Sequence, residues 1–100
     1  MDIQEKAEGR RLFLTFAGEL DHHGMQDALR HIRFSIDTVL PKELVLDFSG
    51  VTFMDSSGIA LIFRSKQRMS ALKGKVSICN VPPQAKRVLD AAGVNRFLNI

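Results

Sequence analysis

A short and almost continuous run of apolar residues lies near the middle of this chain, between two segments of helical periodicity. The run covers residues 44–48, and its length fits a strand that is buried on both faces. Before it, apolar side chains recur at helical spacing from Met25 to Val39, and Pro41 ends the pattern. A second helical pattern follows over residues 57–72. Its inward stripe is Gly58, Ile62, Ser65, Met69 and Leu72. A buried strand between two amphipathic helices predicts an α/β fold.

The amino-terminal segment adds two strands to this arrangement. Apolar side chains alternate over residues 11–17, which predicts a strand with one strongly apolar face. Glu8 and Gly9 fit a hairpin turn, so residues 3–7 are predicted to form a weaker edge strand. Asp21 then fits the cap of the first helix.

The carboxyl-terminal third completes the predicted order of elements. Residues 49–55 are expected to be a loop, residues 76–79 a strand, and Pro82 and Pro83 the start of a short helix that Gly93 closes. Residues 97–100 fit a last short strand. The prediction is therefore one domain over residues 1–100, α/β in class, with a mixed sheet of four to five strands and three helices.

The composition fits a compact domain and argues against a membrane protein. Hydrophobic residues make up 45% of the chain and charged residues 25%, as in ordinary globular domains. No apolar run approaches the roughly 18 residues that span a bilayer. The amino terminus also lacks a basic segment followed by an apolar core. We expect a cytoplasmic protein with no membrane partner, and a buried structural role for the single cysteine, Cys79.

The net charge of +3 raises the question of nucleic-acid binding. The basic residues are dispersed over separate predicted helices, with Arg30 and Arg33 on the first and Arg64 and Arg68 on the second. Tyr and Trp, two of the usual base-stacking side chains, are absent. We therefore interpret the arginines as solvated helix faces and expect no nucleic-acid partner.

The motif Asp55-Ser56-Ser57-Gly58 stands just before the second predicted helix. Alone it is weak evidence, because these residue types also build ordinary turns and helix caps. A hydrolase elbow needs glycines two positions before and after the serine, where Asp55 and Ile59 stand around Ser57. The chain's histidines match no zinc spacing. We expect no catalytic residue, no metal and no cofactor.

Three stretches together resemble the STAS family of anti-sigma factor antagonists. They are residues 18–23, residues 44–58 with the double-serine motif, and residues 75–93, so the resemblance covers nearly the whole chain. The doubled histidine after Gly18-Glu19-Leu20-Asp21 favours the sporulation type within this family. Members commonly carry a further helix after the last strand; because this sequence stops at Ile100, we expect either that the helix is missing or that the chain ends early.

The resemblance implies a partner switch. The unphosphorylated protein would bind an anti-sigma factor and so release a sigma factor. That anti-sigma factor would also be the serine kinase, using ATP and magnesium to phosphorylate Ser57 and abolish binding, and a serine phosphatase would reverse the step. The alternative is a STAS regulatory or scaffold protein of another stress-signalling pathway.

The residues themselves suggest where such a partner would bind. If Ser56 is the N-cap, its hydroxyl accepts a backbone N–H and the Ser57 hydroxyl stays free; if Asp55 caps instead, only the resemblance separates the two serines. Asp21 and Asp55 are expected at the same end of the sheet, either as part of a partner surface or only as helix caps. The predicted partner-binding residues are Asp21, His22, Asp55, Ser56, Gly58, Ile59, Ala60 and Phe63.

Overall fold

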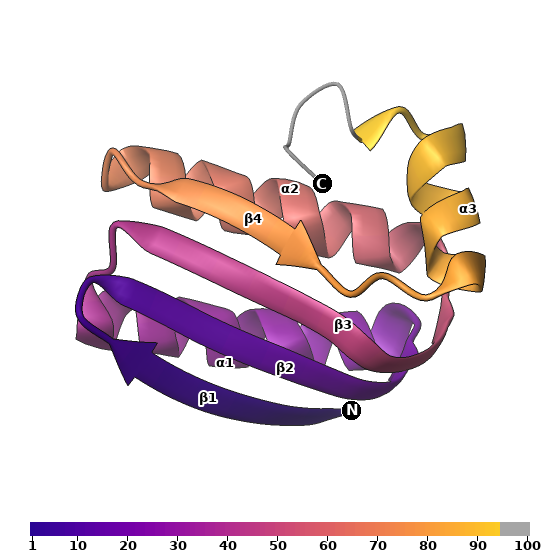
Figure 1. Ribbon diagram of the computed structural model, residues 1–100, viewed down its shortest axis with the longest axis horizontal. Helices are drawn as coiled ribbons and strands as arrows, with labels where there is room; N and C mark the ends of the chain where they lie inside the picture. Colours follow the sequence, from indigo (N-terminus) through magenta and orange to yellow (C-terminus); the bar gives the residue numbers. More distant parts are fainter. Residues whose placement is uncertain (95–100) are drawn as a thin grey trace.

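The computed structural model describes residues 1–94, so the strand predicted for residues 97–100 lies outside the described part of the chain. Seven elements follow one another (Figure 1). They are β1 (Asp2–Glu8), β2 (Arg11–Leu20), α1 (His22–Val39), β3 (Glu43–Met54), α2 (Ser56–Ala71), β4 (Lys75–Cys79) and α3 (Pro83–Ala91).

The four strands form one mixed sheet in the order β1-β2-β3-β4. β1 and β2 pair antiparallel as a hairpin, whereas β2 with β3 and β3 with β4 pair parallel. Parallel neighbours need crossover connections, and α1 and α2 supply them. Figure 1 shows both helices side by side on one face of the sheet. The predicted α/β class, the mixed sheet and the three helices are confirmed.

The core lies between the sheet and these two helices. Side chains of alternating residues on β2 and β3 face the helices, and those of Leu12, Leu14, Leu44 and Leu46 are fully buried. The rings of Phe16 and Phe48 meet edge to face, with centroids 5.5 Å apart. Each such side chain contributes about 1.5–3 kcal/mol when it leaves water. This burial fixes the register of the sheet, because a slip by one residue would turn the apolar face outward.

The predicted loop over residues 49–55 is wrong, since β3 continues as a strand to Met54. Its polar residues hide the strand pattern, but β2 pairs with it from Arg11 opposite Glu43 to Leu20 opposite Met54, with two irregularities on the way. The register shifts twice, between Thr15 and Ala17 and between Gly18 and Glu19, and at each shift β3 carries one more residue than β2. As a result, the double-serine motif follows directly after the end of a strand and does not lie in a loop.

Cys79 is at the predicted strand position but only half-buried. Burial, with a smaller effect from the nearby carboxylate of Asp47, raises the pKa of its thiol. Raising the pKa disfavours the reactive thiolate, in line with a structural role.

Candidate functional site

Two strand ends meet at one edge of the sheet and bring Asp21 and Asp55 into neighbouring positions. Leu20 and Met54 are partners in the register of β2 and β3, and each aspartate follows directly. The backbone N–H of Asp55 donates to the carbonyl of Leu20 at 3.4 Å, which carries the pairing one residue beyond the strand. The carboxyl ends of parallel strands are where open α/β sheets place their binding sites.

Asp21 caps α1. Its Oδ1 accepts a hydrogen bond from the backbone N–H of Gly24 at 2.9 Å. This hydrogen bond is the main reason that the pKa of Asp21 is lowered; some desolvation opposes it, and the nearby His23 adds to it. Asp21 therefore presents an ionised carboxylate at the start of the helix.

Asp55 caps α2, so of the two caps that the sequence left open, Asp55 and Ser56, the structure has Asp55. The backbone of Asp55 is extended, and its Oδ1 accepts a hydrogen bond from the backbone N–H of Ser57 at 2.8 Å. The N–H of Gly58, one of the two that a Ser56 cap would accept, donates to the backbone carbonyl of Asp55 at 3.0 Å instead. Within residues 1–94, neither Ser56 nor Ser57 uses its hydroxyl in a hydrogen bond. Cap geometry therefore does not separate the two serines.

The other predicted partner-binding residues differ in how far they are exposed to solvent. His22 and Ser56 are exposed, and Phe63 is 36% exposed on α2. Ile59 and Ala60 are half-buried, and Ile59 packs against the core. Gly58 is buried: a Cβ there would lie 2.6 Å from Cγ of Met54. It allows α2 to approach β3 closely and offers no side chain to a partner.

Sequence reasoning missed Gln84, which holds the strand end below the motif. From α3, its Oε1 accepts a hydrogen bond from the backbone N–H of Met54, and its Nε2 donates to the Met54 carbonyl, both at 2.8 Å. β4 ends opposite Asp47, so it cannot pair with Met54. The Gln84 amide takes the place of a neighbouring strand. No periodicity or motif in the sequence singles it out.

A second missed residue is Gly24, in the first turn of α1. A Cβ there would overlap the backbone oxygen of Glu19. A glycine inside a predicted helix lowers helix propensity, and this was the available sign of a close backbone approach. Because Gly24 has no Cβ, the start of α1 can approach the end of β2 closely on either side of Asp21.

No side-chain cluster able to hold a metal ion occurs among residues 1–94. The rings of His22 and His23 stand edge to face with centroids 6.1 Å apart. Over the same residues, no helix is both long and apolar enough to cross a membrane.

A mixed four-stranded sheet with two helices on one face, and an Asp-Ser-Ser-Gly motif at the start of the second, is the arrangement that defines the class of this domain. The chain belongs to the STAS domain family, whose sequence model matches residues 2–100. An anti-sigma F factor antagonist of Paenibacillus polymyxa is 29% identical over 102 aligned residues, covering 100% of this chain and 87% of the relative.

Solved structures share the fold. The anti-sigma factor antagonist SpoIIAA in its unphosphorylated form superposes with a TM-score of 0.84 at 24% identity, over 97% of this chain and 85% of the other. The phosphorylated form of SpoIIAA from Bacillus superposes with a TM-score of 0.74 at 24% identity, over 97% of this chain and 88% of the other. At this level of identity the likeness establishes the fold alone.

Proposed function

We propose that this chain is an anti-sigma factor antagonist of the sporulation type, acting in the cytoplasm as a binding protein and not as an enzyme. Its unphosphorylated form binds an anti-sigma factor and releases the sigma factor. The same anti-sigma factor is a serine kinase that modifies Ser57, and a serine phosphatase restores the active form. The observation that carries the proposal is the placement of Asp21, Asp55 and Ser57 at one edge of the sheet, in a chain similar to an anti-sigma F factor antagonist.

The geometry around Ser57 suits a switch that acts at the surface. The residue lies in the first turn of α2, and its side chain is half-buried with a hydroxyl that makes no hydrogen bond within the described residues. A phosphate adds about −1.5 to −2 charges. At a helix N-terminus these charges gain about 0.3–1 kcal/mol from the helix dipole. The fold therefore tolerates the group.

A bound partner would not tolerate the phosphate equally well. The Asp55 carboxylate already contacts the Ser57 backbone N–H, and Asp21 lies on the neighbouring strand end. Covering a doubly charged group beside these carboxylates leaves charges buried without a counterion, which costs several kcal/mol. That cost is larger than the gain at the helix end, so phosphorylation releases the partner while the chain stays folded.

The test uses the serine pair as its own control. The purified chain is incubated with ATP, magnesium and each kinase-type anti-sigma factor encoded in the same genome, and the modified peptide is mapped. We expect wild type and Ser56→Ala to be phosphorylated on residue 57, and Ser57→Ala to remain unmodified and to stay bound to the kinase. Phosphate on Ser56, or no complex with any such kinase, would contradict the proposal. Capture of a stress-signalling scaffold in place of a kinase would favour the alternative function.

A further inference from the structure

Two adjoining hollows form an open groove between α1 and α2, on the helical side of the molecule. One has a volume of about 500 Å³ and the other about 320 Å³, and both are lined by Arg33 of α1 and Arg64 of α2. The larger continues along α2 past Arg68 to Ala71, and the smaller continues along α1 back to His22. The groove therefore runs lengthwise between the helices and reaches the edge where Asp21 caps α1.

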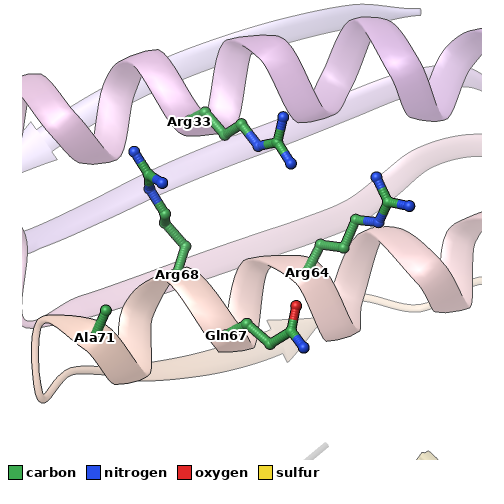
Figure 2. Close-up of a pocket in the computed structure, with 5 residues that line it drawn as sticks. All are labelled: Arg33, Arg64, Gln67, Arg68 and Ala71. Atoms are coloured by element: carbon green, nitrogen blue, oxygen red, sulfur yellow. The ribbon is translucent and has the colours of Figure 1, made fainter.

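The lining of this groove is strongly basic. Figure 2 shows side chains of Arg33, Arg64 and Arg68 reaching into the space between the two helices. Arg68 is engaged by Asp37 of α1, with Nη2 and Oδ1 2.7 Å apart. Arg33 and Arg64 make no ion pair or hydrogen bond in the described part of the chain, and both are exposed. These arginines lie on solvated faces of two helices, as expected, and the packing of α1 beside α2 gathers them along one groove.

The chemistry of the groove selects the kind of ligand. Two unpaired guanidinium groups facing one groove attract anions, and the planar fork of each fits a carboxylate through two parallel hydrogen bonds. Only His22 among the lining residues has an aromatic ring, so the groove offers little for stacking a nucleotide base. Its elongated form matches an extended or helical peptide better than a single compact anion.

We propose that this groove binds a carboxylate-rich segment of the protein partner. The inference deepens the proposed function and rests on it for the partner's identity: the segment belongs to the anti-sigma factor and continues its contact from the Asp21 edge along α1 and α2. Exposed charges act mainly by speeding association, and their effect falls with salt because the screening length is about 8 Å at 0.15 M. The groove therefore speeds association of the partner, whereas the phosphorylation state of Ser57 determines whether the complex persists.

The first experiment measures the association rate and affinity of the anti-sigma factor at low and at physiological salt. The test variant is Arg33→Gln combined with Arg64→Gln, and the matched control is Arg87→Gln, an exposed arginine on α3. We expect the double variant to associate about tenfold more slowly at low salt, with a flatter salt dependence, and the control to behave as wild type. Equal rates for all three proteins, with the double variant still folded, would overturn the proposal.

A second experiment tests the groove without the anti-sigma factor. The full chain is titrated with a synthetic glutamate-rich peptide, and separately with inorganic tripolyphosphate, while backbone amide signals are recorded by NMR. We expect the peptide to shift the amides of Arg33, Arg64 and Gln67 in wild type, and to leave them unchanged in the double variant. Binding of tripolyphosphate without binding of the peptide would overturn the proposal in favour of a small-anion site. Failure of wild type to bind any anti-sigma factor would contradict the proposed function, while the peptide titration still decides the groove.

Discussion

Asp21 combines a structural contact with a charge at the sheet edge, and a single substitution separates the two. Because a backbone hydrogen bond lowers its pKa in the folded chain, its ionised form stabilises the fold above its unfolded pKa of about 3.9. That stabilisation is lost as the pH falls through the lower folded pKa. We expect Asp21→Asn, which keeps a capping oxygen, to melt close to wild type at neutral pH. The difference in unfolding free energy between the two proteins should shrink further below pH about 4.

The same variant also tests the partner surface. Loss of anti-sigma factor binding at an unchanged melting temperature would assign the carboxylate to the interface, whereas intact binding would leave Asp21 only its role as a cap. The sequence predicted the cap and its place at the sheet edge from one residue type after an apolar strand. The sequence alone does not distinguish a helix cap from a partner contact, because the same carboxylate serves both.

The fold requires a residue without a side chain at position 24. A Cβ would meet the carbonyl oxygen of Glu19, a backbone atom that cannot rotate away. We expect Gly24→Ala to lower the free energy of unfolding by about 1–3 kcal/mol, as overpacking does, despite a gain in helix propensity of about 1 kcal/mol. Chemical denaturation measures the change. Gln26→Ala, at an exposed position of the same helix, should stay within about 0.5 kcal/mol of wild type; equal stability of the two variants would show that the backbone gives way.

At the scale of elements, hydrophobic periodicity predicts the start of β3 but not its end. Strongly apolar segments of β2, β3 and both long helices are predictable because one apolar face repeats at the period of the element. Ser49, Gly50 and Thr52 break that repeat, yet they belong to β3, because β2 pairs with Gly50, Val51, Phe53 and Met54 on either side of the irregular positions. Pairing between distant segments overrides local preference there.

No pattern in the sequence predicts the contact between Gln84 of α3 and the end of β3, and a substitution tests it directly. Removing its amide in Gln84→Ala leaves the N–H and carbonyl of Met54 without their partner. We expect a loss of about 1–3 kcal/mol in unfolding free energy and faster hydrogen exchange at the Met54 amide. Arg87→Ala, exposed on the same helix, is the control.

A charge variant at position 84 checks the direction of the second hydrogen bond. In Gln84→Glu an ionised carboxylate would face the Met54 carbonyl oxygen, whereas the protonated form can donate to it. We therefore expect this variant to be destabilised at neutral pH and to recover relative to wild type on acidification. A pH-independent difference would argue that the Gln84 amide contributes only packing.

At the scale of the whole molecule, α1 and α2 together form two different surfaces on the helical face of the sheet. Its edge carries the capping aspartates and Ser57, and its length carries the arginine groove. The fold class and the edge follow from the order of strands and helices. The groove does not, because Arg33 and Arg64 lie 31 positions apart and only the packing of α1 on α2 brings them together.

We expect a negative charge at the Ser57 edge of the sheet to weaken partner binding while the whole domain stays folded. Ser57 lies outside the core, and Asp55 holds its backbone N–H regardless of the side chain. We expect Ser57→Asp to unfold within about 0.5 kcal/mol of wild type. Binding to the anti-sigma factor should weaken at least about tenfold, because the added carboxylate would be covered beside Asp55 and Asp21. Gln4→Glu adds one negative charge on the distant edge strand β1 and should bind normally. A Ser57→Asp protein that loses stability together with binding would show that the switch acts by unfolding and not at the interface.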